Sequence, residues 1–289
     1  MKRRTRRVLF FIATAMFVFF SYVAILYAQG YKYSFRDNKF VRTGAIYLDV
    51  NTDANIYFND RLVGSTSFLG RSFSKGGLLP GKYTVRVTYD GYTTWQKKTV
   101  VEEGFVVDFP KIMILSESED ERAKLIAEIE GLLNVAKPEI SPTLPILSPK
   151  TLEKQNRGSS ISQPNSKNLG EIGTTSEPSQ SYFVKNKLLY KNDGNQLEVL
   201  AQNIVGFAMV GNESRIAWWN SNNEIWVMWL RDTSYQPYRK IGDKELLTRL
   251  STRIKNISWF RDEDHIVVDS LGYEIIELDT RGGINIIKL

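Results

Sequence analysis

The sequence predicts a mainly β protein with one N-terminal transmembrane helix, a small antiparallel β-sandwich and an incomplete β-repeat module. Three observations support this fold class. Residues 8–28 form an uncharged apolar run, residues 44–115 alternate apolar and polar side chains, and residues 182–289 repeat one strand pattern. Alternation with period two is typical of half-buried strands, and recurrence of one pattern is typical of repeat architectures.

The apolar run 8–28 has the length of a membrane span. Its 21 residues would rise about 31 Å as a helix, which matches the hydrocarbon core of a bilayer. A cleavable signal peptide is the alternative, but its apolar region is usually shorter and ends in small residues, whereas Tyr27 is large. We therefore expect a single-pass anchor in the cell membrane, which the protein contacts through residues 8–28.

The excess positive charge lies ahead of this run. The chain has 38 Lys and Arg against 32 Asp and Glu, and five of the basic residues fall within residues 1–7. Because basic residues mark the cytoplasmic side of a span, we expect residues 1–7 to be a cytoplasmic tail and the following domains to be extracytoplasmic. The rest of the chain is nearly neutral, which disfavours nucleic acid as a partner.

Composition excludes several catalytic and metal chemistries. The chain has no cysteine and one histidine, His265, so disulfides, thiolate zinc sites, cysteine nucleophiles and zinc sites with two imidazoles are excluded. No nucleophile, Walker or dinucleotide motif occurs either. We predict no catalytic, cofactor-binding or metal-binding residues and a protein that is not an enzyme. The run Asp262-Glu263-Asp264 before His265 is interpreted as a solvated acidic turn, with weak calcium binding as the alternative.

Residues 44–115 predict the sandwich, with a partly open barrel as the alternative. Apolar and polar side chains alternate over residues 46–50, 56–58 and 83–89. The turns between the runs contain residues that tolerate positive φ. These turn residues are Asn59-Asp60, Pro80-Gly81, Asp90-Gly91 and Gly104.

The order of these strands and turns resembles the PEGA domain. The matching residues are Ala54 to Asp60 with Val63-Gly64, Leu79 to Tyr83, and Gly91-Tyr92 with Trp95. The resemblance covers most of residues 44–110 and implies an extracytoplasmic module of a prokaryotic envelope protein, without catalytic residues. Tyr92 and Trp95 are the candidate ligand-contact residues, because aromatic rings stack on sugars. Packing at a corner of the sandwich is the alternative role for both.

Two connecting segments follow the sandwich. Residues 116–136 place apolar residues at helical spacing after an acidic first turn, which predicts an amphipathic helix. Its net charge of −4 disfavours an anionic membrane, so we expect it to pack against the sandwich or a partner. Residues 137–181 hold six of the nine prolines and nine serines, which predicts a Pro/Ser-rich linker.

Residues 182–289 contain the repeat. Segments 204–227 and 254–279 both predict strand, turn, strand, turn and strand, and segment 182–200 is an incomplete earlier copy. These units resemble blades of a TolB-like β-propeller, most closely at the opening 257–262. A closed propeller needs about four to eight blades, so we expect an incomplete module. It would be a shortened or truncated relative, a stack of sheets, or part of a ring that other subunits complete, and its open edges favour self-association.

Together these features predict a non-enzymatic, membrane-anchored envelope protein. Its extracytoplasmic β domains would bind protein or cell-wall and surface components, and its partner would be an envelope protein or a cell-wall glycan. The alternative is an accessory or regulatory subunit of an envelope hydrolase or secretion complex. A lone hydrolase is disfavoured because the chain lacks a nucleophile motif.

Overall fold

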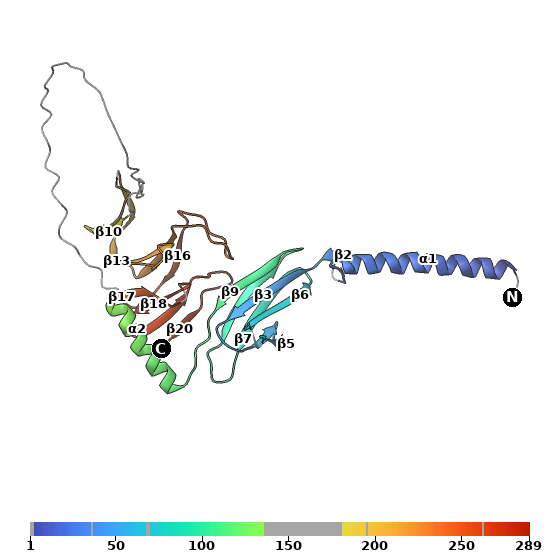
Figure 1. The fold of residues 1–289 in the computed structure, drawn as a ribbon, viewed down its shortest axis with the longest axis horizontal. Helices are drawn as coiled ribbons and strands as arrows, with labels where there is room; N and C mark the ends of the chain where they lie inside the picture. Colours follow the sequence, from blue (N-terminus) through green and yellow to red (C-terminus); the bar gives the residue numbers. More distant parts are fainter. Residues whose placement is uncertain (1–2, 36, 68–69, 136–180, 195, 262) are drawn as a thin grey trace, which may run out of the picture. The chain divides into compact units, whose positions relative to one another are not determined.

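The computed structural model describes residues 3–35, 37–67, 70–135, 181–194, 196–261 and 263–289. Within these residues the chain is mainly β, with one apolar N-terminal helix (Figure 1), as the sequence predicts. It divides into two compact units, residues 1–137 with 205–289, and residues 138–204. The predicted linker 137–181 lies outside the described residues except for Ser181.

Helix α1, Arg3–Ala28, contains the predicted membrane span. Its 26 residues correspond to about 39 Å, and its apolar side chains are exposed rather than packed against the rest of the chain. The helix is long and apolar enough to cross a membrane, as a signal sequence also would be. It is followed by a hairpin of β1, Tyr31–Ser34, and β2, Lys39–Arg42.

Two sheets pack around one core in the region predicted to be the sandwich. One sheet has the order β6-β3-β9 and the other has the order β5-β4-β7-β8. The strands are β3 (Gly44–Val50), β4 (Asn55–Phe58), β5 (Arg61–Ser65), β6 (Ser72–Leu78), β7 (Gly81–Thr88), β8 (Trp95–Val101) and β9 (Val106–Ile112). In β3 every second residue is buried, starting at Gly44, so the alternation in the sequence indicates which face of the strand meets the core.

The prediction of a purely antiparallel sandwich is wrong at one strand pair. Strands β3 and β9 pair in parallel, with Ile46 opposite Val107 and Leu48 opposite Phe109. The first and last strands thus lie side by side in one sheet, while the intervening chain supplies β6 and the second sheet. Parallel neighbours need a long crossover, and here the intervening strands provide it.

The C-terminal residues of the same unit form two antiparallel sheets in which consecutive strands are neighbours, β13-β14-β15-β16 and β17-β18-β19-β20. The first contains β13 (Ile204–Met209), β14 (Arg215–Asn220), β15 (Glu224–Trp229) and β16 (Lys244–Arg249). The second contains β17 (Asn256–Trp259), β18 (His265–Asp269), β19 (Tyr273–Glu277) and β20 (Ile286–Lys288). One apolar core joins the two sheets, with Trp219 and Trp229 from the first and Ile266 and Ile276 from the second.

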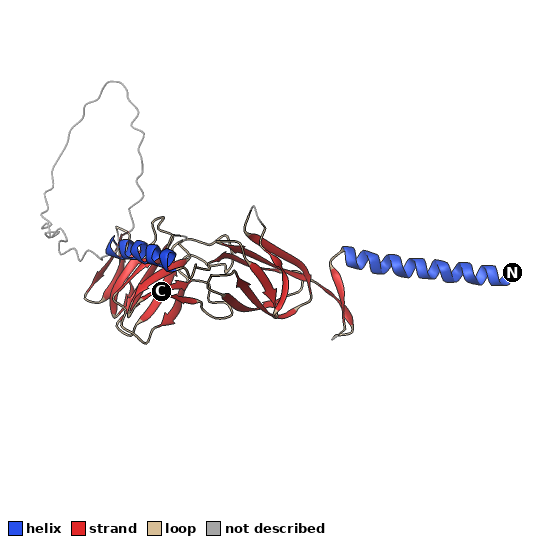
Figure 2. Cartoon of the chain, turned by 90° about the horizontal axis from the view of Figure 1, so that it is seen from below, coloured by secondary structure: helices blue, strands red, loops and turns tan. Residues whose placement is uncertain are grey.

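Helix α2, Glu119–Val135, covers the other face of the sheet β17–β20 (Figure 2). Its buried Ile129 and Leu133 pack with Val267 and Ile275, which alternate along β18 and β19 with residues of the core described above. Both faces of this sheet are therefore apolar, which explains the uninterrupted Ile-Val-Val run of β18. The sequence favoured the preceding sandwich or a partner for this helix, whereas its main contact is the C-terminal sheet.

The second unit contains an antiparallel sheet of order β10-β11-β12 among its described residues. Its strands are β10 (Ser181–Lys185), β11 (Leu188–Asn192) and β12 (Leu197–Gln202). Phe183 and Tyr190 stack across the first pair with their ring centroids 5.3 Å apart. The sequence predicts strands in this segment, and the structure contains them. That they are an incomplete copy of the repeat stays a prediction.

Candidate functional site

A buried lysine joins the sandwich to the C-terminal sheet. Lys97 lies on the inward face of β8, and its side chain is 0% exposed. Its ammonium is 3.2 Å from Glu277 at the end of β19 and 3.7 Å from the carboxylate of Asp279, and it also donates to the Asp279 carbonyl. Trp95, two residues earlier, donates its indole N–H to Glu277 over 3.2 Å. Strand β8 thus supplies a cation and a donor to two acids that follow it by about 180 residues.

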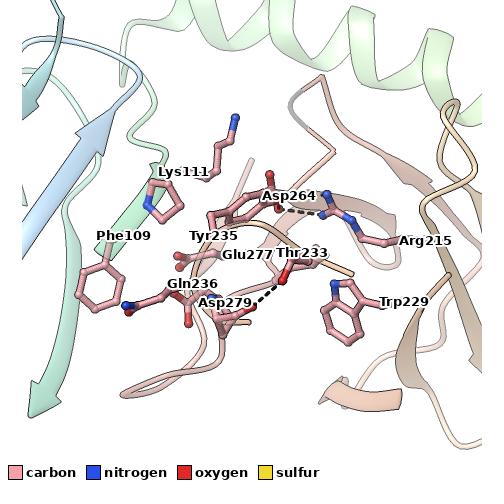
Figure 3. Close-up of a pocket in the computed structure, with 13 residues that line it drawn as sticks. Phe109, Lys111, Arg215, Trp229, Thr233, Tyr235, Gln236, Asp264, Glu277 and Asp279 are labelled. Carbon is pink, nitrogen blue, oxygen red and sulfur yellow. Dashed lines mark hydrogen bonds and ion pairs between the residues drawn. The ribbon is translucent and has the colours of Figure 1, made fainter. Parts of the chain in front are cut away.

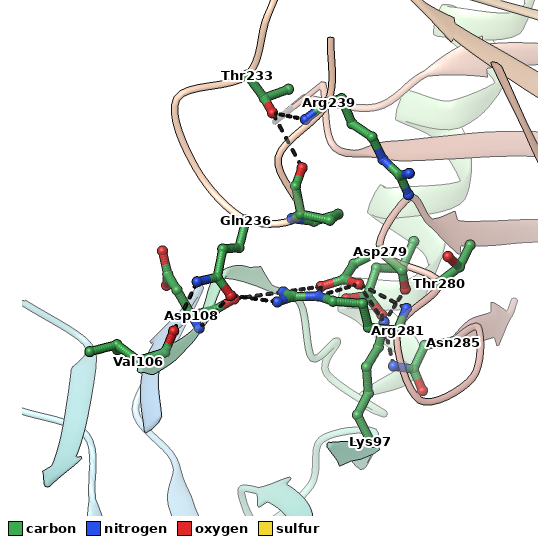
Figure 4. A network of polar contacts seen from close by, with 12 residues as sticks. Lys97, Val106, Asp108, Thr233, Gln236, Arg239, Asp279, Thr280, Arg281 and Asn285 are labelled. Atoms are coloured by element: carbon green, nitrogen blue, oxygen red, sulfur yellow. Dashed lines mark hydrogen bonds and ion pairs between the residues drawn. The ribbon is translucent and has the colours of Figure 1, made fainter. Parts of the chain in front are cut away.

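Arg281 makes a second connection between the same parts (Figure 4). Its guanidinium binds the Asp279 carboxylate at 2.6 Å and donates to the Asp108 carbonyl of β9 at 2.6 Å. The same group donates to the Gln236 side chain at 2.7 Å, and Gln236 donates to the Val106 carbonyl at 2.8 Å. We call Lys97, Glu277, Asp279 and Arg281, together with Gln236, the polar junction.

The polar junction leaves too little space for a substrate. A cavity beside it has a volume of about 30 Å³ (Figure 3), which holds about two water molecules. The three acids that line this cavity are paired with cations, Glu277 with Lys97, Asp279 with Arg281 and Asp264 with Arg215. Burial nevertheless raises the pKa of Glu277, because the loss of water outweighs the attraction of the Lys97 ammonium. The arrangement is that of a structural contact.

The acidic turn before His265 differs from its interpretation as a solvated turn. Asp264 is largely buried, binds the Arg215 guanidinium at 2.8 Å and accepts a hydrogen bond of 2.6 Å from the Tyr235 hydroxyl. Burial and this carboxylate raise the pKa of Tyr235. His265 is buried at the start of β18, opposite Glu277, and Asp262 lies outside the described residues. Across the described residues, no group of three His, Cys, Asp or Glu side chains is placed to hold a metal ion.

Two larger cavities lie where the sandwich, α2 and the loop after β17 meet. Their volumes are about 320 and 330 Å³, and they share Asn51, Leu115, Leu125 and Arg261 as lining residues. We call the two together the α2 groove. A space of this volume is within the range of small-ligand sites.

The α2 groove is lined by both charges and by apolar side chains. Its basic residues are Lys111, Lys124 and Arg261, and its acidic residues are Asp49, Glu121 and Glu128. Arg261 pairs with Glu128 of α2, and this hydrogen bond lowers the pKa of the Glu128 carboxyl. Because the charges balance, the groove suits a ligand that is polar or mixed in character better than a strong anion or cation.

The segment that leaves β9 is fixed along the wall of this groove. The Asn51 side chain donates to the Ile114 carbonyl and accepts from the Ile114 N–H, both at 2.9 Å. Residues 115–117 then pair with the turn that contains Tyr92, because Thr93 N–H donates to the Leu115 carbonyl and Glu117 N–H to the Gly91 carbonyl. Gly91 has φ +75°, a conformation in which glycine is favoured. The groove wall is therefore held by hydrogen bonds from the Asn51 side chain and from the backbone of residues 91–93.

The two candidate ligand-contact residues lie in different environments. Trp95 is buried in the sandwich core, where its ring meets Phe109 edge to face at 5.2 Å. Tyr92 is half-buried, lines the α2 groove and contacts Tyr89 at a ring separation of 5.2 Å. Ligand contact stays a prediction for both, and Tyr92 is the one that borders a cavity large enough for a ligand.

Sequence reasoning missed the polar junction. One signal was present, because Lys97 occupies the same face of its strand as Trp95 and Val101, and a lysine in an inward position needs a partner. The partner was not visible, because no local pattern relates β8 to residues 277–281.

No family model matches this chain, and no curated protein matches it either. The resemblances to the PEGA domain and to propeller blades therefore stay predictions.

Proposed function

We propose that this protein is a single-pass, membrane-anchored binding protein of the cell envelope and not an enzyme. Helix α1 would be the anchor, residues 1–7 would lie in the cytoplasm, and the β domains would face outward to bind protein or cell-wall material. The α2 groove carries this proposal, since it offers a ligand-sized space beside Tyr92 on a wall fixed by hydrogen bonds. Rigid support of this kind lowers the entropic cost of binding.

We further propose that the sandwich is PEGA-like and that the C-terminal sheets are propeller-like blades in an open stack. The strand order within each sheet and the core shared by β13–β16 and β17–β20 support a stack. Helix α2 covers the face on which a further blade would pack, as a capping element does in a repeat array. The outer strands would leave their edges for self-association.

The binding proposal predicts a loss of cell-wall retention when Tyr92 is changed. Full-length protein in detergent would be incubated with purified cell-wall sacculi, and the Tyr92→Ala variant should bind up to about tenfold more weakly, because a stacked ring contributes about 0.5–1.5 kcal/mol. Tyr238→Ala is the matched control, since Tyr238 is 68% exposed and does not line the groove. It should bind like the wild type.

Equal retention of both variants would contradict the groove as the binding site. No retention of the wild type, together with copurification of an envelope hydrolase or secretion complex at equal stoichiometry, would favour the accessory-subunit alternative.

The proposed orientation predicts the result of protease shaving. Protease added to intact cells should remove the β domains and leave a membrane-bound fragment that contains α1, because Arg and Lys at residues 2–7 favour a cytoplasmic N-terminus. Immunoblotting of the membrane and soluble fractions would follow both parts. If the β domains are protected until the cells are lysed, this orientation is contradicted. If the β domains are released without protease, α1 is a cleaved signal sequence.

A further inference from the structure

The hairpin β1–β2 presents aromatic rings immediately after the anchor helix. Phe35 at its tip is 86% exposed, and Phe40 is also exposed. Both rings meet Tyr33 edge to face, at centroid distances of 5.2 and 5.4 Å. Tyr33 and Phe40 are cross-strand partners, so the rings share one face of the hairpin.

The opposite face of the hairpin is held by the rest of the unit. Val41 and Ser34 are buried, and the Lys32 ammonium donates to the Gly77 carbonyl of β6 at 2.7 Å. At the base, the Thr43 hydroxyl donates to the Gly30 carbonyl at 2.8 Å. The aromatic face is therefore presented on a fixed support. Arg42 is exposed on the same face, whereas Lys39 is the cross-strand partner of Ser34 on the other face.

Chain length determines how far these rings can lie from the span. Phe35 is seven residues beyond Ala28, the last residue of α1, so its reach is at most about 23 Å even in an extended chain. The headgroup layer begins at the end of the span and is about 5–8 Å thick. Aromatic rings with adjacent Lys or Arg are the residues enriched at this depth, where the rings meet the acyl boundary and the cations meet lipid phosphates.

We propose that the aromatic face of Tyr33, Phe35 and Phe40 lies in the headgroup layer of the membrane that α1 spans. This inference rests on the proposed anchor role of α1. The partner is the lipid interface, with Arg42, on the same face as the rings, meeting anionic headgroups. The hairpin would then hold the adjoining sandwich against the outer surface of the membrane instead of leaving it on a free tether.

Site-directed spin labelling tests this proposal, because the chain contains no cysteine and single cysteines can be placed at will. Full-length Phe35→Cys and Phe40→Cys variants would be spin-labelled and reconstituted into vesicles of phosphatidylcholine with phosphatidylglycerol. Leu271→Cys is the aqueous control, since Leu271 is 89% exposed in the β18–β19 turn. Phe17→Cys in α1 reports on the span itself.

Labels at positions 35 and 40 should have a ratio of oxygen to nickel-chelate accessibility at least about threefold above that of the Leu271→Cys label, since the interface excludes the polar chelate. Near-UV circular dichroism would confirm that each variant is folded. Because two positions are labelled independently, the test can still be made if one variant does not fold.

Labels at positions 35 and 40 that are as accessible to nickel as the control, with an oxygen-rich label at position 17, would overturn the proposal while the anchor stands. Dipolar broadening at position 35 would place a second copy of the chain on the rings and would also overturn it. A nickel-accessible label at position 17 would overturn the anchor, and the hairpin proposal with it.

Discussion

Replacing Lys97 by methionine should lower the free energy of unfolding by about 3–5 kcal/mol, the usual cost of removing one partner from a buried ion pair. The methionine side chain is about as long as that of lysine. The substitution therefore mainly removes the positive charge that lies 3.2 Å from Glu277. Urea-induced unfolding of the full chain in detergent, followed by near-UV circular dichroism, would measure the change. Lys98→Met is the matched control, because Lys98 is exposed on the other face of β8, and its effect should be small.

The destabilisation by Lys97→Met should grow as pH rises. Burial already raises the pKa of Glu277, so this group stabilises the folded state fully below its unfolded pKa and less as pH rises through its folded pKa. Without the ammonium the folded pKa rises further, and the charged form becomes more costly. A difference between variant and wild type that is constant from pH 4.5 to 8, or a variant as stable as Lys98→Met, would contradict the role given to Lys97.

Gly282→Ala should weaken the same junction by about 2–6 kcal/mol, from backbone strain together with overpacking. Gly282 has φ +67°, and a Cβ atom there would lie 1.8 Å from the Lys98 carbonyl oxygen. That oxygen belongs to the backbone of β8, so it cannot move without displacing the strand that carries Lys97. Unfolding in urea under the same conditions would measure the loss.

Gly283→Ala separates the two causes. Gly283 also has positive φ, at +110°, but a Cβ atom there would meet nothing within 4 Å. This variant should cost only the backbone strain, about 1–3 kcal/mol. Equal losses for the two variants would show that the close approach of Gly282 to β8 does not contribute to stability.

Local patterns in the sequence were sufficient for much of the secondary structure. The alternation at Ile46, Leu48 and Val50 predicts β3 and its buried face, and the apolar run after Arg7 predicts the helix α1. The strand β6, Ser72–Leu78, was missed because it is polar, contains two glycines and shows no alternation. Pairing with β3 holds this strand in place, and the residues of β6 alone do not predict that pairing.

These local patterns do not predict which elements pair over long distances in the sequence. The parallel contact of β3 with β9 and the packing of α2 on β18 depend on which of several apolar faces meet. Period and spacing reveal that a face is apolar but do not identify its partner. The α2 groove forms where residues of the sandwich, of α2 and of the loop after β17 meet. Of its lining residues, only Tyr92 is singled out by the sequence as a candidate ligand contact.

The packing of α2 also determines when this helix can fold into place during synthesis. Ile129 of α2 is covered by Val267 and Ile275, which are made about 140 residues later. The helix leaves the ribosome with its apolar side uncovered, and that side stays uncovered until β18 and β19 have been made. Contacts of such long sequence separation close slowly and late. During that interval the nascent chain exposes an apolar helix that a chaperone would bind, and translation that stops before β17 would leave it permanently exposed.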